Sequence, residues 1–280
     1  MTHDPRAVLR EAGLLPKKSF GQNFLVAAPI AQAIAAACVP DAEVGRARVV
    51  EIGAGTGALT RLLLERARSV TAIERDRDLV PLLRTVDARL VVVEGDAQTV
   101  DLRALLGEPD EASPRVLCGN LPYSITGALL RRAVEHAASL ERAVFMVQAE
   151  VADRIVAQPG TKDWGALTVF TRAAFDVRRL MRAPPGAFHP PPEVTSAVVE
   201  LRPARPPHAV ETERFRALVR GAFEARRKTL RNAWRRIAPT PLVAEAAARA
   251  GISLDARGET LDVAAFARMA AALDALSGPG

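Results

Sequence analysis

Short apolar runs alternate with helical patterns through the first half of the chain, and this alternation restricts the folds that the chain can adopt. Stretches with helical periodicity, such as residues 59–67 and 127–138, separate the runs. Strands that alternate with helices pair in parallel within one sheet and place helices on both of its faces. We therefore expect an α/β fold whose strands are Val49–Ile52, Val70–Ile73, Leu90–Val93, Val116–Cys118 and Val144–Val147.

The next part of the chain predicts an antiparallel hairpin at one edge of this sheet. Two further strand-like runs, Leu167–Arg179 and Thr195–Leu201, follow with little helical pattern between them. Their connection, residues 183–192, contains five prolines. Prolines stiffen a loop, so this connection can hold a side chain in place without a helix.

The end of the chain predicts a second, smaller domain. Residues 203–207 read Pro-Ala-Arg-Pro-Pro, which is typical of a linker. The sequence thus predicts a large α/β domain at 1–203 and a small all-α domain at 208–280. The helical patterns of the second domain cover roughly 211–224, 227–237, 241–250 and 262–277.

Length and composition exclude several classes of protein. With 280 residues, 49% of them hydrophobic, the chain can bury one large core and a small second one. No apolar run approaches the ~20 residues of a membrane span, and the polar N-terminus lacks the apolar segment of a signal peptide. Cys38 and Cys118 lie in apolar surroundings, as expected for buried, reduced thiols of a cytoplasmic protein. Four scattered histidines and no cysteine pair argue against a metal site such as zinc.

Positive charge is concentrated in one segment of the C-terminal half. Residues 211–240 contain nine Lys or Arg and three acids, which accounts for the whole net charge of +6. A neutral body with one basic segment suggests a polyanionic partner such as a nucleic acid. A solvated helix face would give the same pattern, so the charge alone leaves both interpretations open.

A glycine-rich turn follows the first expected strand. Gly53, Gly55 and Gly57 occupy alternate positions, and glycine lets a backbone turn tightly and approach a ligand closely. Glu74 ends the next strand and Asp96 the third one. A carboxylate at Glu74 can accept both hydroxyls of a ribose, and Asp96 can accept from an adenine amino group. Open α/β sheets bind ligands where the carboxyl ends of their strands meet, so these residues predict a cofactor that contains adenosine.

Two cofactors fit this arrangement. Residues 53–58 satisfy the G-x-G-x-x-A fingerprint of dinucleotide-binding enzymes, which also expects an acid about 20 residues further on. S-adenosylmethionine carries ribose and adenine but no phosphate, and a glycine turn followed by two acids meets its needs as well. A dehydrogenase and a methyltransferase are therefore both compatible with the turn.

The tetrapeptide Asn120-Leu121-Pro122-Tyr123 favours the methyltransferase. It follows the apolar run at 116–119, where a strand is expected to end. Pro122 removes one backbone donor and biases Leu121 toward an extended conformation, so the carbonyls of Asn120 and Leu121 can both accept from an exocyclic amino group. Tyr123 can stack on a planar base. These features suit the methylation of a nucleobase amine, and hydride transfer needs none of them.

Several motifs are similar, in order and spacing, to those of the ribosomal RNA adenine N6,N6-dimethyltransferase family, and most of all to its bacterial small-subunit (16S) enzymes. The resemblance covers nearly the whole chain. It implies a Rossmann-like methyltransferase sheet, mostly parallel with an antiparallel edge hairpin, and a small all-α C-terminal domain. Besides the glycine turn, Glu74, Gly95-Asp96 and the tetrapeptide, the matching segments are Lys17–Leu25, Pro184–Pro192, Ser196–Val199, Phe223–Asn232 and Arg257–Leu261.

The resemblance implies that the N-terminal motif folds over the cofactor. Asn23 and Leu25, with Gln22 beside them, would help to enclose S-adenosylmethionine. Gly53 would contact it through its backbone, with Gly55 in the same turn.

The same resemblance assigns the remaining site residues. Glu74 would hold the ribose of the cofactor and Asp96 its adenine. Asn120 would touch both the cofactor and the target amine. Tyr123 and Phe188 would sandwich the flipped adenine of the substrate.

A substrate is implied as well. It is 16S rRNA within an immature small ribosomal subunit, where two adjacent adenosines of the 3′-terminal hairpin would each be dimethylated. We expect a monomer, because no extra apolar stripe is evident, and we expect it to work in the cytoplasm. The basic residues expected to grip the RNA are Arg226, Arg227, Lys228 and Arg231.

The chain departs from the family pattern at Ser124, Trp164, Glu193 and Thr195. None of the four lies in the proposed chemistry, and all bear on how RNA is contacted. Two other functions stay open, namely a non-catalytic RNA-binding or assembly factor and a large-subunit adenine methyltransferase of the antibiotic-resistance type. The intact cofactor acids argue against the first, and the match in the helical tail argues against the second.

Overall fold

The computed structural model describes residues 4–108, 112–224 and 227–277, and the chain divides into two compact units. This division differs from the domains expected at 1–203 and 208–280, because a segment from the middle of the chain packs with the C-terminal helices. Unit 1 comprises Met1–Ala152 and Val177–Pro203, and unit 2 comprises Asp153–Asp176 and Ala204–Gly280.

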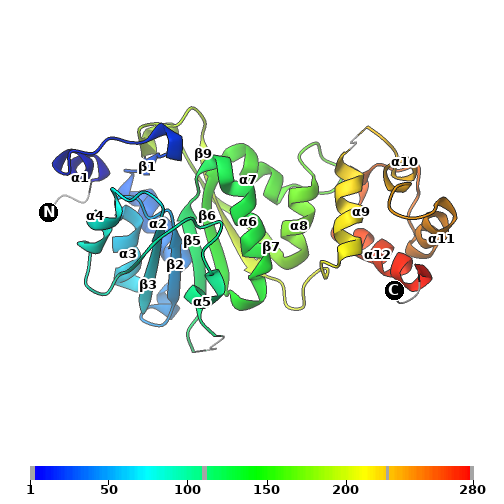
Figure 1. The fold of residues 1–280 in the computed structure, drawn as a ribbon, viewed down its shortest axis with the longest axis horizontal. Coiled ribbons are helices and arrows are strands. Elements are labelled where there is room, and N and C mark those ends of the chain that lie inside the picture. The colour runs from blue at the N-terminus through cyan, green and yellow to red at the C-terminus, as the bar shows by residue number, and fades with distance from the viewer. Residues whose placement is uncertain (1–3, 109–111, 225–226, 278–280) are drawn as a thin grey trace. The chain divides into compact units, whose positions relative to one another are not determined.

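Seven strands of the described residues form one sheet, and two more form a small separate pair (Figure 1). The sheet strands are β2 Arg48–Ile52, β3 Ser69–Glu74, β4 Val91–Glu94, β5 Arg115–Asn120, β6 Arg142–Gln148, β7 Phe175–Ala183 and β9 Ser196–Pro203. The separate pair is β1 Phe24–Leu25 and β8 Phe188–His189, which run antiparallel.

The sheet is mostly parallel, as the alternating sequence pattern predicts. Its strand order is β4-β3-β2-β5-β6-β9-β7, and the neighbours from β4 to β6 all run parallel. β9 is antiparallel to β6, and β7 lies at the edge beyond it. The expected α/β class is therefore confirmed.

Helices α2 (Ala28–Cys38) and α3 (Ala58–Arg66) pack with alternate strand residues in one apolar core. Ile34 and Leu63 of these helices meet Val49, Val116 and Val144 of the sheet, and each of these side chains is at most 2% exposed. None of the helices within the described residues is both long and apolar enough to cross a membrane. The helices before residue 160 are α1 Pro5–Glu11, α2 Ala28–Cys38, α3 Ala58–Arg66, α4 Val80–Arg84, α5 Leu102–Leu106, α6 Thr126–Glu135 and α7 Ala149–Val156.

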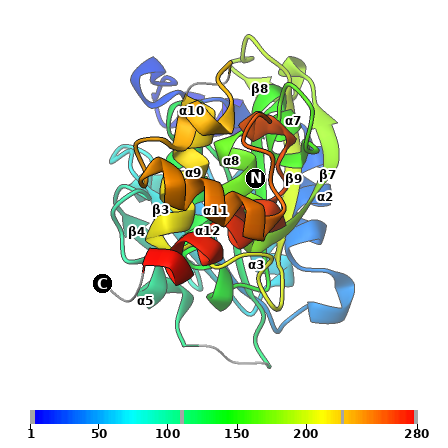
Figure 2. The same cartoon turned by 90° about the vertical axis from the view of Figure 1, so that its right-hand side faces the viewer.

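Unit 2 has a core of its own, centred on aromatic rings. Phe215 and Trp234 both meet Phe266 edge to face, with ring centroids 6.5 and 6.4 Å apart. The indole N–H of Trp164 donates to the Leu261 carbonyl at 3.0 Å, which ties the segment before residue 176 to the C-terminal helices. The helices of this unit, which are labelled in Figure 2, are α8 Ala166–Ala174, α9 Glu213–Glu224, α10 Leu230–Trp234, α11 Thr240–Ala250 and α12 Val263–Ser277.

The strand expected over Leu167–Arg179 is wrong in its first half, where helix α8 precedes strand β7. Val169 and Thr171 are β-branched and prefer strands by themselves. However, Val169 and Ala173 lie one helical turn apart, and both are fully buried in the core of unit 2. Packing against α9 and α12 therefore outweighs the local preference.

The helix expected over 227–237 is also shorter than predicted. In the structure, α10 spans only Leu230–Trp234. Arg227 and Lys228 lie in the turn that precedes it. The N–H of Leu230 donates to the carbonyl of Ala256 at 2.8 Å, which holds the start of the helix to a later loop. The basic residues of this segment therefore do not share one continuous helix.

We predict that Gly119→Ala destabilises unit 1 by about 3 kcal/mol. A Cβ at Gly119 of β5 would lie 2.3 Å from the carbonyl oxygen of Ile52 on the neighbouring strand, so the two backbones would have to separate. The control is Gly127→Ala on the exposed side of α6, where a Cβ meets nothing within 4 Å. This control should leave the protein equally stable or raise its stability by up to about 1 kcal/mol.

The measurement is urea unfolding followed by far-UV circular dichroism. Both tryptophans, Trp164 and Trp234, belong to unit 2, so a fluorescence transition recorded in parallel reports that unit separately. Equal stability of the Gly119 and Gly127 variants would show that the close approach of β2 and β5 is not a constraint.

Candidate active site

The glycine turn between β2 and α3 has a backbone that only glycine adopts readily. Gly53, Gly55 and Gly57 have φ angles of +68°, +61° and +81°, in the left-handed region that strains other residues. A Cβ at Gly55 would also come within 3.1 Å of the Phe24 ring. The turn is therefore a cradle of bare backbone that a ligand can approach closely.

Glu74, at the end of β3, carries a carboxylate that the turn holds in place. Its Oε2 accepts the N–H of Gly55 and its Oε1 accepts the N–H of Asp76, both at 2.8 Å. Burial raises the pKa of Glu74, and hydrogen bonds from backbone N–H groups, including those of Asp76 and Gly55, offset part of that rise. A carboxylate offers about four acceptor positions, so acceptor capacity remains that can take a hydroxyl of a ribose.

Asp96 follows β4 and lies at the same edge of the sheet. Its Oδ1 accepts the N–H of Gln98 at 2.9 Å, and its Oδ2 lies 3.4 Å from a guanidinium nitrogen of Arg75. The Arg75 guanidinium also lies over the Phe20 ring, 5.5 Å from its centre. Because Arg75 is 59% exposed, it can move aside and leave Oδ2 to an adenine amino group.

The tetrapeptide begins at Asn120, the last residue of β5, and faces the glycine turn. The Asn120 carbonyl oxygen lies 3.8 Å from the position of a Cβ at Gly53. The Asn120 Nδ2 donates to the carbonyl of Asn23 at 2.8 Å, so its Oδ1 is left as the acceptor of that side chain. The N–H of Leu121 donates to Met146 of the next strand at 3.0 Å, which fixes the backbone at this point.

Tyr123 is held by a hydrogen bond to a residue far along the chain. Its hydroxyl lies 2.8 Å from Oγ of Ser196, a fully buried residue that begins β9. Burial raises the pKa of Tyr123, and the bond to Ser196 offsets part of that rise. The ring is therefore half-buried, neutral and restrained at its outer end, as a stacking platform requires.

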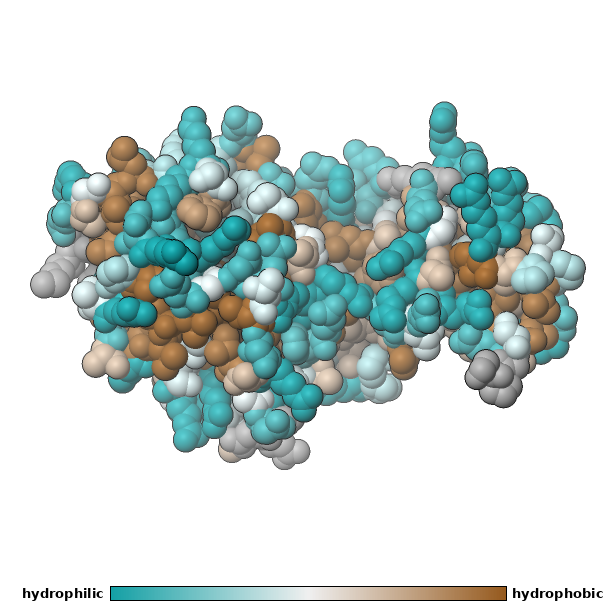
Figure 3. All heavy atoms as spheres, viewed as in Figure 1, coloured by the Kyte–Doolittle hydropathy of each residue, from teal (hydrophilic) through white to brown (hydrophobic). Residues whose placement is uncertain are grey.

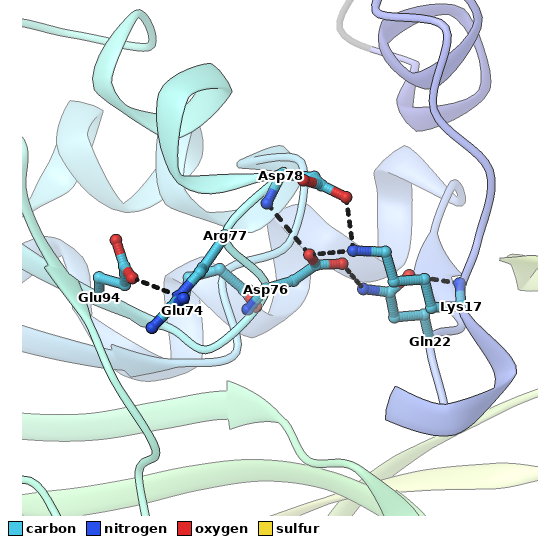
Figure 4. A network of polar contacts seen from close by, with 7 residues as sticks. All are labelled: Lys17, Gln22, Glu74, Asp76, Arg77, Asp78 and Glu94. Atoms are coloured by element: carbon cyan, nitrogen blue, oxygen red, sulfur yellow. Dashed lines mark hydrogen bonds and ion pairs between the residues drawn. The ribbon is translucent and has the colours of Figure 1, made fainter.

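The structure brings nearly all the predicted site residues of unit 1 to one cavity. Residues from the N-terminal segment close it on one side, and Figure 4 shows how Lys17 and Gln22 of that segment reach Asp76 after β3. The predicted residues that line the cavity are Gln22, Asn23, Leu25, Gly53, Gly55, Glu74, Asp96, Asn120, Leu121, Pro122 and Tyr123.

Phe188 is the predicted site residue that does not line this cavity. Its side chain is 4% exposed and belongs to the core that contains Leu25. The reason is the pairing of β8 with β1, which sets Phe188 opposite Leu25. Its part in stacking stays a prediction that requires the ring to leave this core.

The predicted RNA-binding residues belong to unit 2. Arg227 and Lys228 are exposed, and Arg231 is exposed with an ion pair to Asp255 at 3.2 Å. Arg226 lies outside the described residues. Basic side chains are therefore available to a polyanion on this unit.

Of the four departures from the family pattern, Trp164 is fully buried in the core of unit 2 and so replaces a packing residue. Ser124 and Glu193 are exposed, and the Thr195 carbonyl accepts the N–H of Ala149 at 2.9 Å.

Glu51 also lines the cavity, although it is not among the site residues predicted from the sequence. It lies inside β2, is 2% exposed, and accepts a hydrogen bond from Thr60 Oγ1 at 2.6 Å. Burial raises the pKa of Glu51 to about 7. The signal in the sequence was a carboxylate within an otherwise apolar strand, just before the glycine turn.

Comparison with known protein families gives one match that spans almost the whole chain. A family model described as ribosomal RNA adenine dimethylase matches residues 14–275. A similar protein, Ribosomal RNA small subunit methyltransferase A of Magnetococcus marinus, is 44% identical over 270 residues, which are 95% of this chain and 94% of that protein. The protein of the same name from Geobacter metallireducens is 40% identical over 280 residues, and the aligned region covers 96% of this chain and 100% of that protein.

Two solved structures are similar to the chain over most of its length. The structure of the 23S rRNA methyltransferase ErmE superposes with a TM-score of 0.65 at 29% identity. The superposition covers 90% of this chain and 99% of the ErmE chain. A dimethyladenosine transferase from Plasmodium falciparum gives a TM-score of 0.73 at 23% identity, and the superposition covers 86% of this chain and 94% of that one. At that identity the second likeness shows a common fold alone.

We predict that Glu51→Gln stabilises the ligand-free protein at high pH by about 3 kcal/mol and has little effect near pH 4. The folded protein binds a proton at Glu51 more tightly than the unfolded chain does, since the pKa rises from 4.5 to about 7. Stability from this group is complete below pH 4.5 and is lost as the pH rises through 7. Gln keeps the acceptor for Thr60 and does not titrate.

Urea unfolding at several pH values between 4 and 8 measures the difference between the two proteins. Parallel stability curves for the wild type and the Gln variant would contradict a raised pKa at this position.

Proposed function

Since the chain belongs to the ribosomal RNA adenine dimethylase family, it is an S-adenosylmethionine-dependent enzyme that dimethylates adenines of 16S rRNA, and we propose how its residues carry that reaction. The family that the motifs predict is thereby confirmed, and the dehydrogenase interpretation of the glycine turn is wrong. The assignments of individual residues below are supported by the geometry of the cavity.

The cavity fits S-adenosylmethionine. Glu74 would accept the ribose hydroxyls through its remaining acceptor capacity, and Asp96 would accept from the adenine amino group. The bare backbone at Gly53 and Gly55 allows the methionine portion to come close, while Asn23 covers it from the N-terminal side. When bound, the cofactor supplies a methyl group activated by its sulfonium.

The substrate adenine would enter the cavity from outside. Leaving its stack costs a few kcal/mol, which stacking on Tyr123 offsets by roughly 1–3 kcal/mol. The hydrogen bond to Ser196 keeps the ring of Tyr123 from turning. Phe188 is the proposed second stacking partner, after a movement out of its core.

The tetrapeptide would orient the N6 amine. Asn120 Oδ1 and the Leu121 carbonyl accept the two amine hydrogens, so that the nitrogen lone pair points at the methyl group. Such positioning supplies several kcal/mol of the barrier. The amine becomes positively charged as it is methylated, the neighbouring carbonyls stabilise that charge, and the proton then leaves to water.

One observation carries this proposal: Asn120 faces the glycine turn, and the carbonyl of Asn23 holds its side-chain amide by a hydrogen bond. It places an oriented acceptor beside the turn that would hold the methyl donor.

We further propose that the substrate is 16S rRNA within an immature small ribosomal subunit, in the cytoplasm, with two adjacent adenosines of the 3′-terminal hairpin each dimethylated by a monomer. Exposed basic residues of unit 2 support an RNA partner, and Figure 3 shows hydrophilic side chains over much of the visible face of that unit. Labelled methyl transfer to immature particles, compared with free 16S rRNA, tests the substrate. Light scattering of the free protein tests the oligomeric state.

We predict that Asn120→Ala lowers the rate of methyl transfer by at least about 100-fold, because the amine loses an oriented acceptor. The assay is transfer of labelled methyl groups to immature small-subunit particles at saturating cofactor. Far-UV circular dichroism and RNA affinity serve as controls, and both should match the wild type. Transfer at the wild-type rate would remove Asn120 from the mechanism.

We predict that reversing Arg227 and Lys228 to Glu weakens RNA binding while S-adenosylmethionine binding stays unchanged. If both side chains contact phosphates, the slope of log affinity against log salt should fall in magnitude by about 2. Arg249→Glu on α11 is the matched control, since Arg249 is exposed but already paired with Glu245. Filter binding at several salt concentrations measures the slope, and an unchanged slope would sink the assignment.

A further inference from the structure

Asp76 is a buried carboxylate that no proposed catalytic or cofactor contact uses. It lies two residues after Glu74 and is 3% exposed. Three donors converge on it, as Figure 4 shows, and two of them come from the N-terminal segment Lys17–Leu25, which we call the strap. An ionised group that is this deeply buried needs such partners to be tolerated.

The two bonds from the strap are short and mutually supporting. Lys17 Nζ lies 2.5 Å from Asp76 Oδ1, and Gln22 Nε2 donates to Oδ2 at 2.7 Å. The Gln22 Oε1 in turn accepts the N–H of Lys17 at 2.7 Å. Lys17 and Gln22 are therefore both hydrogen-bonded to the carboxylate of Asp76, which holds this part of the strap in place.

The strap reaches the reacting groups directly. Asn23, which follows Gln22, accepts the hydrogen bond from the Asn120 amide at 2.8 Å. On the other side, the Asp76 N–H donates to Glu74 Oε1. Asp76 is thus linked both to the proposed ribose carboxylate and, through the strap, to the proposed orienting amide.

We propose that Asp76 is a positioning residue that holds the strap over the cavity and thereby sets the orientation of the Asn120 amide. This rests on the proposed function, in which Asn120 orients the target amine. Asp76 itself touches neither cofactor nor substrate, and it acts through Gln22 and the Asn23 carbonyl.

Electrostatics support the assignment. Burial by itself would raise the pKa of Asp76, but the hydrogen bonds from Lys17 and Gln22 outweigh it and lower the pKa below its ordinary value. The carboxylate is therefore charged at neutral pH. Loss of that charge leaves Lys17 with the exposed carboxylate of Asp78 as its partner, at 2.6 Å, and weakens the hold on Gln22.

The test compares Asp76→Asn with Asp78→Asn. Both residues contact Lys17 Nζ at nearly the same distance, but only Asp76 also accepts from Gln22. For Asp76→Asn we expect the KM for S-adenosylmethionine to rise about tenfold and kcat to fall about tenfold, because both the cover of the cavity and the Asn120 amide lose their support. Asp78→Asn should stay within about twofold of the wild type in both constants, and RNA affinity should be unchanged in both variants.

A rescue separates positioning from a loss of stability. In the double variant Gln22→Glu with Asp76→Asn, the amide and the carboxylate exchange places, so the hydrogen bond is restored with its polarity reversed. We expect this variant to recover most of the lost kcat relative to Asp76→Asn alone. Lys17→Met removes a partner without altering the segment after β3, and it should shift KM and kcat in the same directions even if Asp76→Asn does not fold.

The inference is overturned if Asp76→Asn and Lys17→Met both keep KM and kcat within twofold of the wild type. It is equally overturned if Asp78→Asn loses as much activity as Asp76→Asn, since the charge of Lys17 would then be the whole effect. A lowered melting temperature with unchanged kinetic constants also counts against it. Activity retained by Asn120→Ala would contradict the proposed function, whereas an inactive Asn120→Ala beside a normal Asp76→Asn contradicts this inference alone.

Discussion

The active site depends on the parallel pairing of β2 with β3 on one side and with β5 on the other. Because these strands run in one direction, their carboxyl ends meet at the same edge of the sheet. Three groups that are far apart in the sequence, the glycine turn, Glu74 and Asn120, therefore line one cavity. Gly119 permits the close contact of β2 and β5 just before Asn120, since its missing side chain leaves room for the Ile52 carbonyl.

Hydrogen bonds then fix the groups that this edge assembles. Glu74 is held by two backbone N–H groups, Asn120 by the carbonyl of Asn23, and Tyr123 by Ser196. Each bond leaves part of its side chain, an acceptor or a ring face, available to a ligand in the cavity. An enzyme that works by positioning gains from such restraint, because the reacting atoms need little reorganisation when substrate binds.

The parallel strands and the glycine turn could be predicted because their signals are local. Apolar runs and glycine spacing reflect the backbone geometry of a few adjacent residues. The errors fall where distant packing decides the outcome. Val169 and Thr171 of α8 prefer strands but are helical because this segment packs in the core of unit 2. The burial of Phe188 likewise depends on the pairing of β8 with β1, and its role in stacking stays a prediction. Asp76 could not be predicted, because its partners Lys17 and Gln22 lie more than 50 residues away in the sequence. Glu51 leaves a signal in the sequence, but its burial beside the cavity shows only in the folded chain.

The sequence by itself determined the fold class, the cofactor turn, the family and eleven of the residues that line the cavity, because each of these leaves a motif of contiguous or regularly spaced residues. The tertiary structure decided which residues belong to each unit, where the basic side chains lie around α10, and which carboxylate holds the strap. Those features depend on contacts between segments far apart in the sequence, such as Leu230 with Ala256 and Lys17 with Asp76. No local pattern encodes them, since the hydrogen bonds form only after the sheet has brought the partners together.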